Sequence, residues 1–350
     1  MKAQLILENG KCFNCEMFGK QKNVSGELIF TTGMVGYQEI ITDPAYAGQI
    51  VVMTFPMIGN YGINLEDVES KKSYLSALVV REKCDTPSNF RCEMSLDDYL
   101  TAQGVCGIYG LDTRSLTKII RDNGTMKGVI VKLNTPKEEI ENLMSLADNK
   151  DVINETTKNV ECVINSSGKY DVAVLNMGSD ETLIEGLKKA DCKITVYPAD
   201  KSAEEILSKG HKALFISDGA GSPEDRKETI ENVKNMLGKI PMAGISLGHQ
   251  IIALSMGAKV EKLKFGHHGA NQPVKDLTDG KVYVTCQNHN YIVKDIPTDI
   301  TVTYENVNDK SIEGFDSLKY KTQGIQFIPE TLEGGLTIEK LFAAVLKEVK

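Results

Sequence analysis

The chain has 350 residues, of which 41% are hydrophobic and 25% are charged, and its formal net charge is −8. Because one ordinary core does not accommodate this length, we expect two domains. The acidic balance disfavours nucleic acids and anionic membranes as partners, since both attract clusters of Lys and Arg. No apolar run approaches a membrane span, and the N-terminal apolar stretch is too short for a signal peptide, so a cytoplasmic location is expected.

The first 150 residues begin with β-structure. Short β-prone runs separated by Gly-containing turns predict strands over 5–7, 12–18, 27–31 and 49–55. Helical spacing follows over 96–102 and 113–121, with Asp112 as the N-cap of the second helix. Cys12 and Cys15 form a Cys-x-x-Cys pair without a second pair at zinc-finger spacing, which favours a turn between strands over a metal ligand.

A polar segment over 151–170 predicts a linker between a domain at 1–150 and a domain at 171–350. A regular alternation of strands and helices follows it. Strands are predicted over 171–176, 193–197, 212–217 and 240–245, and helices over 181–190, 203–209 and 224–237. Such alternation indicates βαβ units and a parallel sheet, whose ligands bind at the carboxyl ends of the strands. Residues 218–221 and Ser246 both follow predicted strands.

The segment 244–250 (Gly-Ile-Ser-Leu-Gly-His-Gln) lies between a predicted strand and a predicted helix. A small-x-nucleophile-x-Gly sequence in that position is the signature of a nucleophile elbow. Its glycines permit a sharp turn that exposes the central side chain at a helix N-terminus. That side chain here is Ser246, and the sequence offers no obvious base to activate it.

Several motifs together resemble the small subunit of carbamoyl-phosphate synthetase over nearly the whole chain. They are Gly36–Pro44 (GYQEIITDP), Pro56–Gly62 (PMIGNYG), Ser88–Arg91 (SNFR), Leu111–Thr117 (LDTRSLT), Gly244–Gln250, Lys264–Gly269 (KFGHHG) with Asn271, Pro273 and Val274, and Gln287–His289 (QNH). The N-terminal motifs are the specific part, because elbows occur in many folds. The resemblance implies an α/β protein: a β-rich α/β N-terminal domain, then an open, mostly parallel-sheet class I glutamine amidotransferase-like domain.

In that family a cysteine thiolate at the elbow attacks the side-chain amide of glutamine, a histidine acts as the base and a glutamate orients it. The released ammonia passes to a large subunit, which uses ATP and bicarbonate to make carbamoyl phosphate for pyrimidine or arginine biosynthesis. The resemblance therefore implies a heterodimer with that large subunit. No cofactor and no metal site is expected in this chain, which also lacks a Walker A motif.

The catalytic positions of the family are changed in this chain. Ser246 stands at the nucleophile position and Ile328 at the base position, whereas the orienting glutamate is kept as Glu330. A serine hydroxyl needs a positioned base, and removing the base from a serine triad costs roughly 10⁶ in kcat. We therefore expect no useful glutaminase activity. Replacement of the base by a non-isosteric Ile fits natural loss better than an engineered trap.

The glutamine-pocket positions implied by the resemblance are partly kept. Those kept are Gly219, Gly221, the backbone of Leu247, the side chain of Gln250, and Asn288. Gly33 replaces a serine, which removes a hydrogen-bond donor worth about 0.5–1.5 kcal/mol. Asn290 replaces a glycine and so adds a side chain, and Tyr291 is the following aromatic residue.

The sequence thus predicts a glutaminase-deficient small subunit that supports or regulates an ammonia-using synthetase. Three alternatives remain: a module that senses glutamine or another amino acid without cleaving it, a subunit of a related ATP-dependent ligase, and a serine hydrolase using Ser246. A hydrolase would need a later histidine, and His267, His268 and His289 are the candidates. Of the other histidines, His249 is expected to bond nearby backbone and His211 to lie in a solvated turn.

Overall fold

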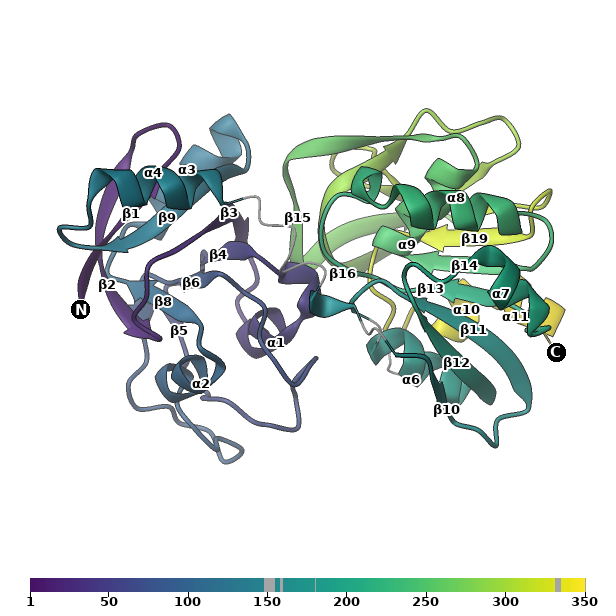
Figure 1. Cartoon of the computed structure of the whole chain (residues 1–350), viewed down its shortest axis with the longest axis horizontal. Coiled ribbons are helices and arrows are strands. Elements are labelled where there is room, and N and C mark those ends of the chain that lie inside the picture. The colour runs from purple at the N-terminus through teal and green to yellow at the C-terminus, as the bar shows by residue number, and fades with distance from the viewer. Residues whose placement is uncertain (148–154, 158–159, 180, 331–334, 350) are drawn as a thin grey trace. The chain divides into compact units, whose positions relative to one another are not determined.

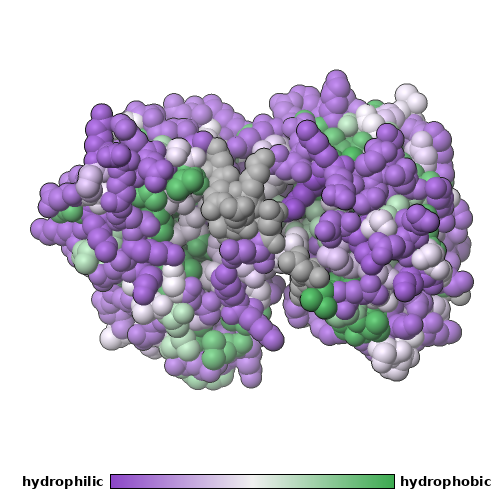
Figure 2. All heavy atoms as spheres, viewed as in Figure 1, coloured by the Kyte–Doolittle hydropathy of each residue, from purple (hydrophilic) through white to green (hydrophobic). Residues whose placement is uncertain are grey.

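The structure is a computed structural model that describes residues 1–147, 155–157, 160–179, 181–330 and 335–349. Its contacts divide the chain into two units. The first comprises Met1–Asn154 with Lys264–Gly269, and the second comprises Glu155–Leu263 with Ala270–Lys350. Hydrophilic residues predominate on the face shown in Figure 2. Among the described residues, no helix is long and apolar enough to cross a membrane.

The first unit is built on a closed barrel with the strand order β1-β2-β8-β6-β4-β3-β9. Its strands are β1 (Lys2–Leu7), β2 (Cys12–Gly19), β3 (Val24–Thr31), β4 (Gln49–Met53), β6 (Ala77–Val79), β8 (Cys106–Tyr109) and β9 (Met126–Lys132), and β5 (Met57–Ile58) pairs with β7 (Glu82–Lys83) outside the barrel. Its helices are α1 (Tyr37–Thr42), α2 (Leu96–Gln103), α3 (Thr113–Asn123) and α4 (Lys137–Ser145) (Figure 1).

Two details of this unit test the sequence interpretation. The Asp112 side chain accepts a hydrogen bond from the Ser115 amide at 3.0 Å, so the predicted N-cap of α3 is confirmed. The predicted turn at Cys12 and Cys15 is wrong: both lie within β2, where they pair with Ile6 and Ala3 of β1. The period-two alternation of the strand leaves Cys12 exposed and Cys15 buried.

The second unit is an open sheet in the order β10-β12-β11-β13-β14-β19-β18-β16-β15-β17. The strands are β10 (Cys162–Ile164), β11 (Tyr170–Asn176), β12 (Cys192–Pro198), β13 (Leu214–Ile216), β14 (Met242–Ile245), β15 (Lys259–Asp276), β16 (Val282–Lys294), β17 (Thr301–Asn306), β18 (Ile312–Ser317) and β19 (Thr322–Ile325). Strands β12, β11, β13, β14 and β19 run parallel, which agrees with the βαβ alternation of the sequence.

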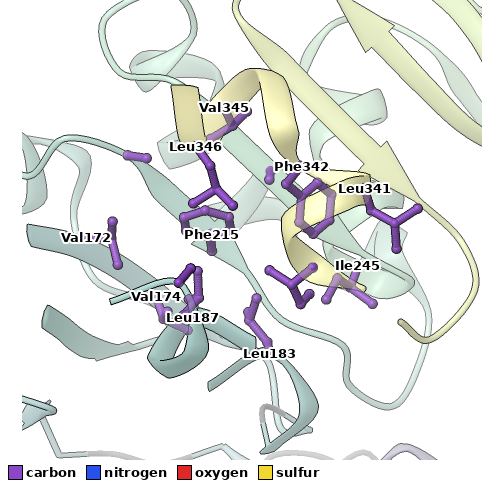
Figure 3. Close-up of a cluster of buried hydrophobic side chains, with 14 of the residues drawn as sticks. Val172, Val174, Leu183, Leu187, Phe215, Ile245, Leu341, Phe342, Val345 and Leu346 are labelled. Carbon is purple, nitrogen blue, oxygen red and sulfur yellow. The ribbon is translucent and has the colours of Figure 1, made fainter. Parts of the chain in front are cut away.

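Helices cover both faces of this parallel core. They are α6 (Glu181–Lys189), α7 (Ala203–Ser208), α8 (Lys227–Met236), α9 (Leu247–Ser255), α10 (Ile338–Leu341) and α11 (Ala343–Val349). Alternate residues of β11 point to opposite faces, so Val172 and Val174 pack with α6, α10 and α11 (Figure 3), whereas Ala173 and Leu175 pack with α7, α8 and α9. This double cover holds the carboxyl ends of the strands in place.

The segment between the two units carries more structure than its polar composition suggests. Cys162–Ile164 of the predicted linker 151–170 forms β10, which pairs antiparallel with β12. Residues 151–154 and 158–159 of that range lie outside the described residues. The division into units also differs from the predicted domains 1–150 and 171–350, because Lys264–Gly269 of strand β15 belong to the first unit. There the carbonyl of Lys264 accepts from the Thr125 amide at 2.7 Å.

Candidate functional site

Ser246 forms a strained turn between β14 and α9. It is the N-cap residue of α9, its φ is 49° and its ψ is −105°, and its side chain is 2% exposed. A non-glycine residue in this region of backbone space is strained, and such strain collects at functional sites. The strand–turn–helix context is that of a nucleophile elbow, as the sequence predicts.

The two glycines of the elbow are required by its packing. A Cβ on Gly244 would lie 2.5 Å from the carbonyl carbon of Gly248, and a Cβ on Gly248 would lie 2.3 Å from the carbonyl oxygen of Ile216. Both distances are far inside van der Waals contact, so only glycine lets the start of α9 approach β13 and β14 this closely. The glycines therefore define the fold of the turn, whether or not the site reacts.

Polar residues follow three neighbouring parallel strands at their carboxyl ends. Asp218 lies two residues after β13, Ser246 follows β14 directly, and Gln326 follows β19 directly. The Ser246 amide donates to the carbonyl of Ile325 at 2.8 Å, which joins the last two positions. This edge of the sheet is where ligands bind in open α/β folds.

The carboxamide of Gln326 holds the Ser246 hydroxyl, and its orientation follows from its neighbours. Gln250 Nε2 donates to the backbone carbonyl of Tyr291 at 2.7 Å, and a carbonyl oxygen only accepts. The same Nε2 donates to Gln326 Oε1 at 3.0 Å, so Gln326 presents its Nε2 to Ser246 Oγ, at 3.4 Å. In the part of the chain that the structure describes, this is the only hydrogen bond of Ser246 Oγ, and a carboxamide nitrogen takes up no proton.

His249 does not serve as the missing base. Its ring is fully buried, stacked on Phe315 with the ring centroids 4.8 Å apart. Burial lowers the pKa of His249 to about 3, so the imidazole is neutral near pH 7. Its Nδ1 lies 3.2 Å from Gln326 Oε1, an acceptor, and therefore donates to it. The predicted bond to nearby backbone is thus replaced by a bond to a side chain 77 residues away.

A carboxylate occupies the backbone amides beside the elbow. Oδ1 of Asp218 accepts from the Gly219 amide at 2.7 Å and from the Leu247 amide at 3.3 Å, and Asp218 is buried. In a nucleophile elbow, the amide of the residue after the nucleophile and an amide from a neighbouring loop stabilise the oxyanion. In this chain the corresponding amides, those of Leu247 and Gly219, already donate to Oδ1 of Asp218. This oxygen therefore occupies the place where the oxyanion of a reacting substrate would be stabilised.

The positions that the sequence analysis predicts for the base and its orienter, Ile328 and Glu330, lie on the segment after β19. The Ile328 amide donates to the carbonyl of Cys286 at 2.9 Å, and the aliphatic side chain of Ile328 offers no acceptor. The Glu330 amide donates to the carbonyl of Leu336 at 2.9 Å, and its carboxylate is exposed beside Gly335. No hydrogen bond joins the Glu330 carboxylate to another described residue.

The remaining histidines are committed elsewhere or lie in the other unit. His289 uses both ring nitrogens, Nδ1 toward the Tyr291 carbonyl at 2.8 Å and Nε2 toward Gln287 Oε1 at 2.9 Å. His267 and His268 belong to the first unit. The predicted solvated turn at His211 is wrong: its side chain is 5% exposed and bridges Asp171 and the Tyr197 hydroxyl.

The structure brings together only part of the predicted site. Ser246, Leu247 and Gln250 lie on one turn, and Gly219 joins them through Asp218. Tyr291 joins through its carbonyl, and Asn288 and Asn290 are buried on the same strand, β16. Gly221 has a φ of 96°, which suits the turn after β13, and Gly33 lies in the first unit between β3 and α1.

Sequence reasoning did not identify the roles of Asp218 and Gln326. The signals were present: Asp218 directly precedes Gly219 in Asp-Gly-Ala-Gly, and Gln326 begins the segment that ends in Glu330. Their contacts depend on the order of β13, β14 and β19 in the sheet. The Ser246 hydroxyl therefore acts as a hydrogen-bond acceptor, and the amides of Gly219 and Leu247 are both engaged by Asp218. Among the described residues, no group that could accept a proton is hydrogen-bonded to Ser246 Oγ.

Two family models match the chain. Residues 5–130 match "Carbamoyl-phosphate synthase small chain, CPSase domain", and residues 173–347 match "Glutamine amidotransferase class-I". A carbamoyl phosphate synthase small chain of Clostridium perfringens is 45% identical over 347 residues, covering 99% of this chain and 99% of that protein. A carbamoyl phosphate synthase pyrimidine-specific small chain of Halalkalibacterium halodurans is 42% identical over 351 residues, covering 99% and 97%. A solved glutamine amidotransferase of Thermotoga maritima aligns over 45% of this chain and 74% of its own, with 20% identity and a TM-score of 0.38.

Proposed function

The chain belongs to the family of carbamoyl-phosphate synthase small chains, and from this premise we propose that it is a small subunit that does not hydrolyse glutamine. Its role is then to support or regulate an ATP-using large subunit that draws ammonia from solution. The hydrogen bonding of Ser246 carries this proposal. The hydroxyl accepts from the Gln326 carboxamide, and Ile328 stands where the family has its histidine.

The Asp218 carboxylate supports the proposal independently. Attack on an amide places negative charge on the carbonyl oxygen, and amides at the elbow normally stabilise that charge. Here the amides of Gly219 and Leu247 are engaged by Asp218 Oδ1. Binding a substrate carbonyl would require displacing this carboxylate, and the charge of the carboxylate would oppose that of the oxyanion.

The decisive experiment is a steady-state glutaminase assay of the chain with its large subunit. We expect no glutamine turnover above background, together with carbamoyl phosphate synthesis when ammonia is supplied. The double variant Ser246→Cys with Ile328→His should gain measurable turnover, whereas neither single variant should. Turnover by the unmodified chain at the rate of active family members would refute the proposal.

Binding of glutamine without cleavage is a second candidate, favoured by the ordered Gln250. Its side chain is fixed through Nε2 by the Tyr291 carbonyl and by Gln326, so it is already oriented for a ligand at this edge of the sheet. Titration calorimetry with glutamine distinguishes the two: millimolar or tighter binding supports a sensing role, and absence of heat at high concentration removes it. A fluorophosphonate probe tests the serine hydrolase alternative, and we expect no labelling of Ser246.

A further inference from the structure

The motif Ser88–Arg91 has no role in the candidate site, and it presents an unusually exposed aromatic side chain. Phe90 is 96% exposed, the highest value of any large hydrophobic residue among those described. The Cys92 amide donates to the Asn89 carbonyl at 3.1 Å, which closes a β-turn with Phe90 at its first corner. A phenyl ring in water has no partner to stabilise it, so its position calls for an explanation beyond folding.

Hydrogen bonds hold this turn rigidly. Asn89 Oδ1 accepts from the Arg91 amide at 2.8 Å, an Asx turn that suits the first position of a β-turn. The Ser88 amide donates to the Asn60 carbonyl at 2.9 Å, and the Glu93 amide donates to the Ile63 carbonyl at 2.9 Å. The turn is therefore tied on both sides to the segment that contains the second N-terminal motif, Pro56–Gly62.

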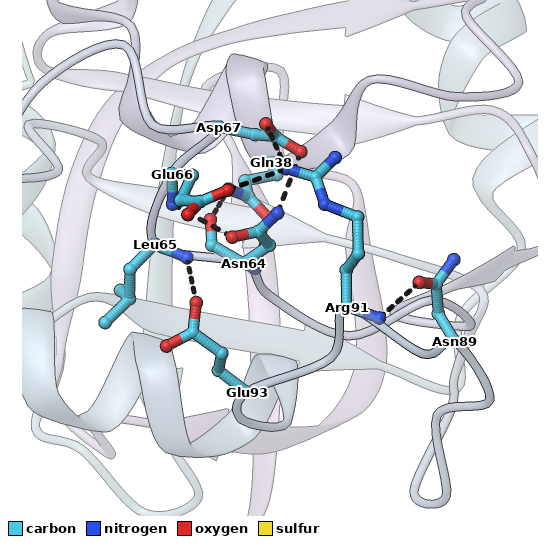
Figure 4. A network of polar contacts seen from close by, with 8 residues as sticks. All are labelled: Gln38, Asn64, Leu65, Glu66, Asp67, Asn89, Arg91 and Glu93. Atoms are coloured by element: carbon cyan, nitrogen blue, oxygen red, sulfur yellow. Dashed lines mark hydrogen bonds and ion pairs between the residues drawn. The ribbon is translucent and has the colours of Figure 1, made fainter.

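The Arg91 side chain braces the turn from the other direction (Figure 4). Its guanidinium lies 2.9 Å from Asp67 Oδ1 and 3.4 Å from Glu66 Oε2. Asp67 is itself held by Asn64 Nδ2 at 3.2 Å, and the Asn64 amide donates to the buried Gln38 at 2.9 Å. This network runs from the interior of the first unit to the turn, so the aromatic ring is presented on a pre-ordered support, which lowers the entropy cost of docking.

The surroundings of the ring indicate the chemistry of its partner. The network also holds the backbone of the exposed Leu65, whose amide donates to Glu93 Oε1 at 2.9 Å. Three carboxylates, those of Glu66, Asp67 and Glu93, accompany one cation, Arg91, so the network is acidic overall. An acidic surface opposes a second copy of itself and attracts a basic one.

We propose that Phe90 anchors the first unit of this chain to the ATP-using large subunit, in an apolar socket bordered by Lys or Arg side chains. This proposal rests on the proposed function, which supplies the large subunit as the partner. Aromatic side chains with few rotatable bonds, buried at the centre of an interface and surrounded by polar residues, carry most of the binding energy in protein complexes. Phe90, an exposed aromatic side chain on a turn that the acidic network braces through Arg91, has the character of such an anchor.

The test compares binding of full-length variants to the purified large subunit. Phe90→Ala should raise the Kd about 10- to 100-fold, and Phe90→Leu should restore part of the loss. Leu318→Ala is the matched control, because Leu318 is 94% exposed in the second unit, and it should leave the Kd unchanged. Thermal melting of Phe90→Ala should equal that of the unmodified chain, since Phe90 is 96% exposed and its truncation removes little buried surface. Raising the salt concentration should slow association.

Each other outcome has a defined meaning. Equal Kd values for Phe90→Ala and the unmodified chain, or equal losses in Phe90→Ala and Leu318→Ala, would overturn the inference while leaving the proposed function intact. Failure of the unmodified chain to bind the large subunit would instead contradict the proposed function. A homodimer of the chain alone in analytical ultracentrifugation, lost in Phe90→Ala, would assign the ring to a second copy and also overturn the inference.

Discussion

The Leu247 amide donates a hydrogen bond to Oδ1 of Asp218, across 3.3 Å between two neighbouring strand ends. The same oxygen accepts from the Gly219 amide, so one carboxylate satisfies both donors beside the elbow. Because both amides already donate to Asp218, neither is available to stabilise negative charge on the carbonyl oxygen of a substrate. Under the proposed function, exchanges at Ser246 and Ile328 alone would therefore leave this obstacle to catalysis in place.

Removing the Asp218 carboxylate should increase any activity restored at the elbow. In the background of Ser246→Cys with Ile328→His, Asp218→Ala should raise glutamine turnover at least about 10-fold, because a single oxyanion donor is worth roughly 10²–10³ in kcat. Asp218→Asn removes the charge and keeps an oxygen, so its effect should be intermediate, and Asp218→Glu should give no gain. Turnover in the order Asp, Asn, Ala from highest to lowest would contradict this role of the carboxylate.

Gln326 should contribute to stability as the common partner of several buried groups. Gln326→Leu leaves the Nδ1–H of His249 and one hydrogen of Gln250 Nε2 without their acceptor, and we expect a loss of about 1–3 kcal/mol in the free energy of unfolding. Urea denaturation measures it. Gln4→Leu is the control, because Gln4 makes one exposed hydrogen bond, to Asn14. A loss no larger than that of the control would show that the network is energetically neutral.

The backbone strain at Ser246 predicts an unusual order of stability. At a φ of 49° and ψ of −105°, alanine retains the strain and glycine relieves it, a difference of about 1 kcal/mol or more after the greater entropy of glycine in the unfolded chain. We therefore expect Ser246→Gly to unfold at a higher temperature than Ser246→Ala. The reverse order would mean that the turn is relaxed as it stands.

His249 should make stability depend on pH. Its pKa is lowered from 6.5 to about 3 by burial, so between those values the unfolded chain binds a proton that the folded chain does not. The free energy of unfolding should fall as the pH drops from about 6.5 toward 3, by at most about 1.4 kcal/mol per pH unit from this residue. His249→Asn should lower stability at neutral pH and flatten this slope. A slope parallel to that of the unmodified chain would assign the effect to other groups.

The elements that the sequence predicts most reliably are those with local signals. The elbow needs only its two glycines and its flanking strand and helix, and the cap of α3 needs only Asp112 and the amide three residues on. The parallel core follows from the alternation of apolar strands and amphipathic helices. Each of these signals lies close in sequence to the element that it predicts, within about one strand–turn–helix unit.

The parts that could not be predicted depend on contacts between distant segments. Gln326 donates to Ser246 only because β19 pairs with β14 in the sheet. Neither segment contains a local sequence signal that predicts this pairing. The sequence around His211 (Lys-Gly-His-Lys) is typical of a surface turn. In the fold, however, the His211 side chain is buried and bonded to Asp171 on β11 and Tyr197 on β12. Polar side chains are satisfied by partners that only the tertiary fold supplies, so their sequence neighbours are a poor guide to their burial.

The assignment of Lys264–Gly269 to the first unit means that the polypeptide passes between the units at residues 154–155, 263–264 and 269–270. Truncation at the first crossing would therefore not yield two independent proteins. An N-terminal fragment would lack the Lys264 carbonyl, which accepts a hydrogen bond from the Thr125 amide. A C-terminal fragment would contain Lys264–Gly269, which pack in the first unit, without the rest of that unit. A protease that cleaved only at that crossing would give two bands on a denaturing gel and a single species in size-exclusion chromatography.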